Sequence, residues 1–101
     1  MTDFTTYPYA DISTAHVTKE DAALITESGP DITGVISVYA RGWFCYIPNE
    51  AYWNSSSEEW VQSGMSNSYI HLQHKLMEAG ISYARFDSDG ETVSGLPTFD
   101  W

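Results

Sequence analysis

The hydrophobic positions of this chain change their period several times, and each change predicts a different element. Residues 35–40 and 43–47 are rich in β-branched and aromatic residues, and Arg41 and Gly42 separate them. Two such runs around a short glycine-containing break predict a β-hairpin. Arg41 is a poor residue for positive φ, so a three-residue turn with Gly42 in the left-handed conformation is an alternative. The register therefore stays open by one residue.

The second of these runs is apolar on both faces. In an extended strand, Trp43, Cys45 and Ile47 lie on one side, and Phe44 and Tyr46 lie on the other. Such a strand is either central and covered on both faces, or it carries an aromatic binding surface. In both cases Cys45 lies within an apolar strand, which favours a buried, inert thiol over a nucleophile.

A helix is predicted directly after the N-terminal segment. Thr18 and Asp21 have the spacing of a capping box, and acidic residues occupy the first turn. The helix runs from about residue 19 to 27, because Ser28-Gly29-Pro30 cannot continue it.

Two more helical segments follow the hairpin. Ser57, with two glutamates after it, predicts a helix start, and Gly64 interrupts this helix. Residues 66–80 carry apolar side chains at i, i+3 and i+7, which predicts an amphipathic helix that ends at Gly80.

The two ends of the chain predict further strands. Residues 1–12 alternate loosely around Pro8, which cannot donate to a ladder and therefore favours a sheet edge. Residues 82–87 and 91–96 flank an Asp-Gly pair, which predicts a second hairpin. The order of elements predicts one α+β domain over residues 1–101. We expect an antiparallel sheet of four to five strands with two or three helices packed on it.

The charge of the chain is one-sided. It holds 14 Asp and Glu residues against 4 Lys and Arg residues, for a formal net charge of −10. Direct nucleic-acid binding and attraction to an anionic membrane both need cations, so we expect neither. A basic partner protein is favoured instead, because opposite charge speeds association and fixes orientation.

The single cysteine excludes an intrachain disulfide and a thiolate metal cluster. The N-terminal residues lack the basic start and apolar run of a signal peptide, and no stretch has the length and apolarity of a membrane span. We expect a protein of the host-cell cytosol with no metal and no cofactor.

The stretch DISTAHVTKED, residues 11–21, raises the question of an enzyme. Ser13 would need His16 as its base, an orienting acid such as Asp11, and an oxyanion hole. No nucleophile-elbow glycines flank Ser13, and hydroxyls at a strand-to-helix junction commonly bond local backbone. A structural role is favoured, and a small hydrolase is the alternative.

Two other patterns suggest metal ligands and are better explained otherwise. His71 and His74 are spaced i, i+3, but a metal needs further ligands and His16 is the only other histidine. Residues 87–91, DSDGE, resemble the start of a calcium loop but lack its distal glutamate. A solvated helix face and an Asp-Gly turn are the favoured interpretations.

Three segments carry a resemblance to a known family. ISTAHVTKED, VYARGWFCYIP and ISYARFDSDGETVSGLPTFDW resemble a family of small uncharacterised proteins carried by plasmids, integrative elements and phages. Its members share an ISTAH(I/V)T opening and an FDxDG…LPxxDW ending. The resemblance implies no activity and no catalytic residue. It implies a setting, the accessory genes of mobile elements, where anti-defence proteins are common.

We therefore expect a non-enzymatic inhibitor of a nucleic-acid-handling defence complex, of the anti-CRISPR or anti-restriction type. As a partial DNA mimic, it would place carboxylates in a basic groove that normally holds phosphates, and exposed aromatic residues would anchor the contact. The expected partner-binding residues are Glu58, Glu59, Asp87, Asp89 and Glu91 for charge, and Tyr52, Trp53 and Trp60 as anchors.

The alternative to a monomeric inhibitor is a self-associating interaction protein. Its homodimer interface would be formed by exposed aromatic residues, namely Phe44, Tyr46, Phe99 and Trp101.

Overall fold

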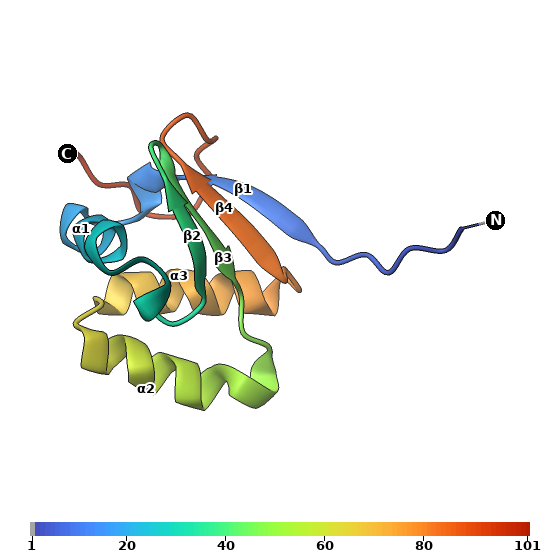
Figure 1. The fold of residues 1–101 in the computed structure, drawn as a ribbon. Coiled ribbons are helices and arrows are strands. Elements are labelled where there is room, and N and C mark those ends of the chain that lie inside the picture. The colour runs from blue at the N-terminus through green and yellow to red at the C-terminus, as the bar shows by residue number, and fades with distance from the viewer. Residues whose placement is uncertain (1) are drawn as a thin grey trace.

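The fold is built on a sheet of four strands, which a computed structural model describes together with the rest of residues 2–101. The strands are β1 (Tyr9–Ser13), β2 (Val35–Tyr39), β3 (Gly42–Tyr46) and β4 (Tyr83–Asp87). Their order across the sheet is β1-β4-β3-β2 (Figure 1). β3 pairs antiparallel with both β2 and β4, whereas β1 joins β4 in parallel. The predicted α+β class, with a mostly antiparallel sheet, is confirmed.

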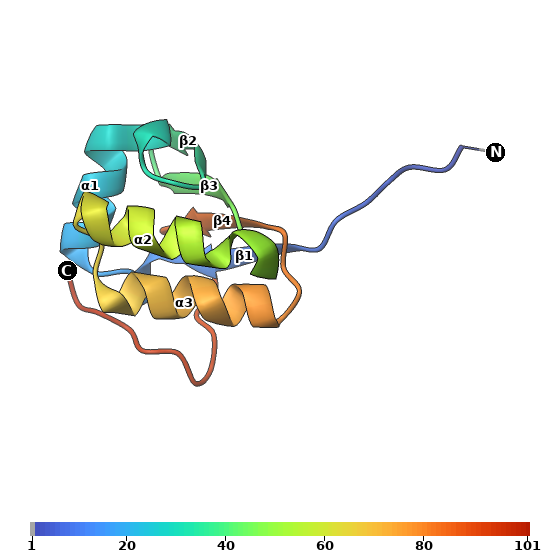
Figure 2. The same ribbon diagram turned by 90° about the horizontal axis from the view of Figure 1, so that it is seen from below.

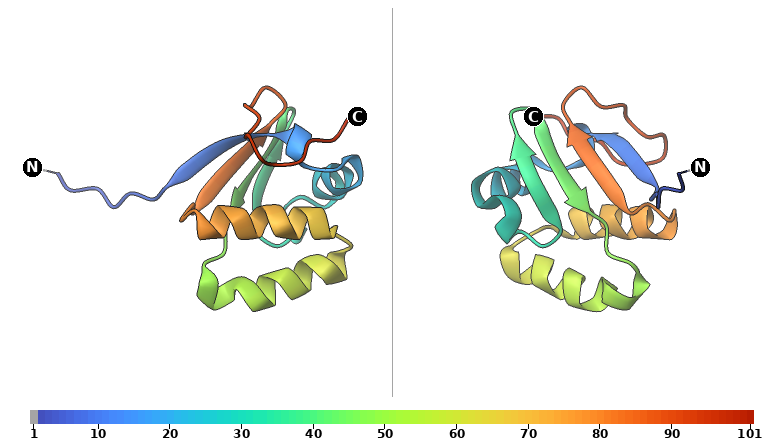
Figure 3. Two further views of the ribbon diagram at one scale, coloured as in Figure 1. Left: turned by 180° about the vertical axis from the view of Figure 1, so that it is seen from behind. Right: turned by 45° about the vertical axis from the view of Figure 1, so that its right-hand side comes forward.

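Within residues 2–101, three α-helices pack on one side of the sheet (Figure 3). They are α1 (Lys19–Ser28), α2 (Trp53–Ser63) and α3 (Asn67–Glu78). The single-turn 3-10 helices η1 (Thr14–His16), η2 (Gly29–Asp31) and η3 (Glu50–Tyr52) connect them to their neighbours. Seen from below, α2 and α3 run side by side, and α1 lies at one end of the pair (Figure 2).

Side-chain caps explain where two of the helices begin. The Thr18 hydroxyl accepts a hydrogen bond from the backbone N–H of Asp21 at 3.1 Å, as the capping-box spacing predicts. The Ser66 hydroxyl accepts from the backbone N–H of Tyr69 in the same way at the start of α3. These bonds satisfy amides that have no partner within the helix.

The second helix begins at Trp53, earlier than the predicted start at Ser57. Asn49 caps the preceding η3 turn, which runs directly into α2. Gly64 ends α2 with a φ of 89°, a left-handed conformation that glycine adopts without a steric penalty.

The first hairpin is confirmed, but its turn lies one residue earlier than the predicted break. Tyr39 pairs with Gly42, so Ala40 and Arg41 form the turn. Gly42 belongs to β3 and is not among the glycines with positive φ. A Cβ atom at Gly42 would lie 1.7 Å from the carbonyl oxygen of Phe86. Glycine is therefore required because the backbone of β4 approaches here.

The predicted second hairpin is wrong, because residues 91–96 form no strand in the described structure. β4 has β3 on one side and β1 on the other, so the residues after it have no free ladder to join. They turn back across the end of β1, where the N–H of Ser13 donates to the carbonyl of Glu91 at 3.0 Å.

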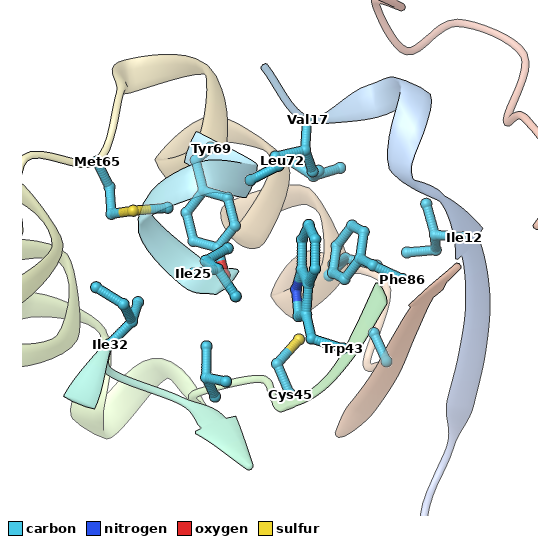
Figure 4. Close-up of a cluster of buried hydrophobic side chains, with 14 of the residues drawn as sticks. Ile12, Val17, Ile25, Ile32, Trp43, Cys45, Met65, Tyr69, Leu72 and Phe86 are labelled. Carbon is cyan, nitrogen blue, oxygen red and sulfur yellow. The ribbon is translucent and has the colours of Figure 1, made fainter. Parts of the chain in front are cut away.

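The core lies between the sheet and the helices (Figure 4). The rings of Trp43 in β3 and Phe86 in β4 stack with centroids 5.2 Å apart. Trp60 of α2 is fully buried, and its Nε1 donates to the carbonyl of Thr33 at 2.8 Å. Its ring packs edge-on against Tyr69 of α3, with centroids 5.6 Å apart. These contacts join α2 to both α3 and the loop before β2.

Asp21 joins α1 to the turn between α2 and α3. Its side chain is buried and accepts hydrogen bonds from the backbone N–H of Ser66, at 2.9 Å, and from the Ser66 hydroxyl. A buried carboxylate is stable only when such donors replace water. The same serine therefore caps α3 and fixes it against α1.

Candidate functional site

The predicted partner-binding carboxylates lie in two separate groups. Glu58 and Glu59 are exposed on α2, whereas residues 87–91 begin at the end of β4. Figures 1 and 3 place these two segments at opposite ends of the sheet. The structure therefore does not bring the five predicted carboxylates into one patch.

The group at the end of β4 is engaged in internal contacts. Asp87 is buried and accepts hydrogen bonds from the Tyr39 hydroxyl at 2.5 Å and from the N–H of Asp89 at 2.7 Å. The bond from Tyr39 lowers the pKa of Asp87, and burial, with the same bond, raises the pKa of Tyr39 to about 12. Asp89 forms an ion pair with Arg41, while Glu91 is exposed. Asp87, predicted to bind a partner, is thus buried and occupied by internal hydrogen bonds, and Glu91 is the carboxylate of this group that is exposed without an ion pair.

The predicted aromatic anchors also differ in exposure. Trp60 is 0% exposed, so the prediction that it anchors a partner is wrong. Trp53 is half-buried, and its ring packs edge-on against Trp60 and, at 4.9 Å between centroids, against His74. Tyr52 is 62% exposed. Of the three predicted anchors, Tyr52 is the one that projects into solvent.

The outer side of α2 combines charge with an exposed apolar surface. Glu58 and Glu59 lie there, and Val61 is as exposed as Tyr52. A groove with a volume of about 350 Å³ runs between α2 and the loop before β2, and Tyr52, Glu59 and Tyr46 contribute to its walls. Within the described residues, this side is where a predicted anchor and predicted carboxylates meet.

The face of the sheet that the helices leave open is rich in aromatic residues. Phe44 and Tyr46 of β3 are 37% and 40% exposed, and their rings contact Tyr39 and Tyr83 with centroids 5.4 and 5.5 Å apart. Of the two interpretations of this strand, an aromatic surface on one face is therefore the one observed. Tyr9 continues the aromatic surface onto β1 and is exposed as well.

A polar contact crosses this open face. The Arg85 Nε donates to an Asp11 carboxylate oxygen at 2.7 Å, and the Tyr9 hydroxyl donates to the same oxygen at 2.5 Å. The bond from Tyr9 lowers the pKa of Asp11, and the bond to Asp11 raises the pKa of Arg85. Asp11 is thus held on the open face by its neighbours in the sheet.

The residues of the hydrolase alternative do not form a triad. The Ser13 hydroxyl accepts from the N–H of Ala15 at 3.0 Å. Both ring nitrogens of buried His16 face the backbone of the C-terminal tail: Nδ1 lies 2.7 Å from the carbonyl of Pro97, and Nε2 accepts from the N–H of Val93 at 2.8 Å. His16 therefore holds the C-terminal tail against η1 through both ring nitrogens, and neither nitrogen is available to Ser13.

The aromatic residues of the dimer alternative lie on different surfaces. Phe44 and Tyr46 belong to the open face of the sheet. Phe99 is half-buried and donates its N–H to the carbonyl of Ala15, while the Trp101 ring Nε1 donates to the carbonyl of Val17. The last two therefore contact the chain around η1 and do not extend the aromatic surface of β3.

Metal ligation and thiol chemistry find little support in this arrangement. Within residues 2–101, no three His, Cys, Asp or Glu side chains gather in a way that could hold an ion. Nδ1 of His74 lies 3.1 Å from a Glu78 carboxylate oxygen, and His71 is exposed. Burial raises the pKa of the Cys45 thiol to about 12. No helix in the same residues has the length and apolarity needed to cross a bilayer.

A second groove, which the sequence did not predict, lies at the end of the open face. Tyr7, Tyr46 and Tyr83 line it together with Glu50 and Glu78, and its volume is about 650 Å³. The alternation along β4 places Tyr83 on the open face, and this was the available signal. The other members come from segments that only the tertiary fold brings together.

Comparison with known proteins gives one match. No curated protein and no solved structure matches the chain. The profile of one family matches residues 9–101, which include every helix and strand of the fold. The chain belongs to the family DUF5983, matching the part described as the C-terminal domain of a family of unknown function.

Proposed function

We propose that this protein is a non-catalytic binding domain that inhibits a basic, nucleic-acid-handling partner. The side formed by α1, η2, η3 and α2 would contact that partner. In the setting that the sequence resemblance implies, the partner is a defence complex such as a CRISPR effector or a restriction enzyme.

The distribution of charge carries this proposal. The stretch that contains α1, η2, η3 and α2, residues 19–63, holds two Lys or Arg residues: Lys19, the first residue of α1, and Arg41, which pairs with Asp89. The acidic residues of this stretch therefore have little compensating charge. Those that are exposed are Glu20, Glu27, Asp31, Glu50, Glu58 and Glu59. Such a surface attracts a basic groove at long range and repels nucleic acid itself.

Tyr52 and Val61 supply exposed apolar surface, which charge alone does not provide. Rim charges mainly affect the rate of association, whereas buried aromatic and aliphatic contacts hold a complex together. Tyr52 lines the same groove as Glu59, and Val61 follows Glu58 by three residues on α2, so each exposed apolar side chain has a carboxylate beside it that the same contact could neutralise. We place the contact on α2, because the carboxylates after β4 are largely engaged internally.

The test is affinity capture from a bacterial lysate at low salt, with the double variant Glu58→Lys/Glu59→Lys compared with wild type. The matched control is Glu91→Lys/Asp100→Lys, which makes the same charge change at exposed positions outside α2. We expect wild type and control to retain a nuclease or another nucleic-acid-binding complex, and the α2 variant to lose it. Added nucleic acid and high salt should both release that complex.

Two results would overturn the proposal. One is capture that is equal for all three proteins, because the α2 carboxylates would then be irrelevant. The other is a partner that added nucleic acid does not displace, because the contact would then lie outside its nucleic-acid groove.

A further inference from the structure

The groove lined by Tyr7, Tyr46 and Tyr83 lies at one end of the sheet. The start of β1, the η3 turn and the end of α3 meet there, and Figures 1 and 2 both show these segments at the same end of the molecule. Its volume of about 650 Å³ is large enough for a side chain of a partner. Its lining combines aromatic rings and carboxylates.

Three tyrosines form the aromatic part of the lining. The Tyr83 ring packs edge-on against Tyr7 at 6.1 Å and against Tyr46 at 5.5 Å between centroids, with interplanar angles of 74° and 72°. Because neighbouring rings are turned steeply to each other, the three do not stack into one flat surface. Tyr7 and Tyr46 are also substantially exposed, so their rings are available to a ligand. Aromatic faces attract cations through the ring quadrupole.

Two carboxylates supply the charge. Glu50 and Glu78 line the groove and are both exposed. Glu78 is restrained by Nδ1 of His74, 3.1 Å away, and it is the last residue of α3. The negative end of the helix dipole therefore points to the same region and also favours a cation. Among the described residues that line the groove, none is Lys or Arg.

We infer that this groove binds an arginine or lysine side chain that the partner protein presents. The inference deepens the proposed function, since it rests on that function for the existence of a basic partner. Rings and carboxylates around one volume fit the two parts of such a side chain: a cationic head and an apolar stem. An anionic or purely apolar ligand would leave Glu50 and Glu78 without compensation.

The experiment is an NMR titration of isotopically labelled protein with the peptide Ac-Gly-Arg-Gly-NH2. The comparison peptide carries citrulline, which has nearly the shape of arginine and no charge. We expect the arginine peptide to shift the backbone signals of Tyr46, Glu50, Glu78 and Tyr83 in a saturable way, and the citrulline peptide to leave them in place.

A variant pair shows whether the groove itself is responsible. Glu50→Gln/Glu78→Gln should raise the dissociation constant of the arginine peptide by about three- to tenfold, since it removes both carboxylates. The matched control Glu91→Gln/Asp100→Asn makes the same charge change at exposed residues outside the groove and outside the proposed partner surface, and it should leave the constant within about twofold. Equal weakening by both variants, or shifts centred on α2, would overturn the inference.

The outcome can be separated from that of the proposed function. If the arginine peptide binds the groove but no nucleic-acid-binding partner depends on α2, the proposed function fails and the groove stands. If the partner depends on α2 and the peptide does not bind, the groove fails and the proposed function stands.

Discussion

The two faces of the sheet use the same kinds of residue for different purposes. Along β4, Phe86 points to the helices and is 0% exposed, whereas Tyr83 and Arg85 point the other way. Along β3, Trp43 is buried, and Phe44 is 37% exposed. Aromatic residues therefore fill a core on one face and form a surface on the other. The aromatic content of 15% consequently says little about the size of the core.

The two faces also differ in whether their polar side-chain atoms have hydrogen-bond partners. On the helix side, the Trp43 Nε1, the Tyr69 hydroxyl and the Gln73 Oε1 are buried and have no hydrogen-bond partner among the described residues. On the open face, the hydroxyls of Tyr9 and Tyr39 both donate to carboxylates. Packing on the covered face therefore leaves three polar atoms unpaired, although Trp60 and Asp21 are hydrogen-bonded there, whereas both of these hydroxyls on the open face are paired.

The largest expected effect separates two phenylalanines on opposite faces. Phe86→Ala should destabilise the protein by about 3–5 kcal/mol, because it leaves a cavity beneath Trp43. Phe44→Ala removes a partly exposed ring and should cost less than about 1 kcal/mol. Urea unfolding followed by tryptophan fluorescence measures both. Similar losses for the two variants would show that the open face is covered in solution.

The second prediction concerns the close approach of Gly42 in β3 to the backbone of Phe86 in β4. Gly42→Ala should cost about 3 kcal/mol, because its Cβ would collide with the Phe86 carbonyl and push β3 away from β4. Gly80→Ala is the control: it has a φ of 79° but nothing within 4 Å of the added carbon, so it should cost only about 1–2 kcal/mol. The free energy of unfolding of each variant checks this order, and the reverse order would contradict the pairing of the two strands.

Local signals were sufficient to predict much of this sheet and its helices. The first hairpin, the Thr18 cap and α3 depend on residues within a few positions of one another, and all three were predicted from these local patterns. The pairing of β1 with β4 joins residues 9–13 to residues 83–87, and no local signal announces it. The second hairpin was wrong for that reason: β1 occupies the edge that residues 91–96 would have used.

The candidate sites follow the same division. The exposure of Glu58 and Glu59 follows from a polar helix face, but the burial of Trp60 was missed. Trp53 and Trp60 stand at i and i+7 in α2, which was a signal for an inward-facing stripe. The second groove needed the tertiary fold, because residues 7, 46, 50, 78 and 83 come from five different elements: the segment before β1, then β3, η3, α3 and β4.

A third prediction uses the hydrogen bond between Tyr39 and Asp87 on the open face. The folded pKa of Tyr39 is about 12, above its ordinary value of 10.0. The unfolded chain therefore loses this proton first as pH rises. The stabilisation is complete below about pH 10 and disappears as the pH approaches 12. Tyr39→Phe should flatten the loss of unfolding free energy over that window, and an unchanged slope would mean that the bond does not form in solution.

Because Asp87 accepts this hydrogen bond as a carboxylate, the stability of the protein should also depend on pH in the acid range. Its folded pKa is lowered, so its contribution is present above the ordinary pKa of 3.8 and is lost as pH falls through the folded value. Asp87→Asn should therefore lose less stability than wild type between about pH 5 and pH 2. Chemical unfolding at a series of pH values measures this difference.

The smallest effect is expected at the ion pair between Arg85 and Asp11. Both side chains are partly exposed, at 39% and 46%, so water and salt screen the pair. Arg85→Met keeps an apolar side chain of similar length, and we expect no measurable change in unfolding free energy at physiological salt. A loss as large as that of Phe86→Ala would mean that the open face contributes to the core. If Phe44→Ala and Arg85→Met both leave stability unchanged, the aromatic residues of this face are not needed to hold the fold together. The residues of this surface would then be free to contact a partner without any loss of stability.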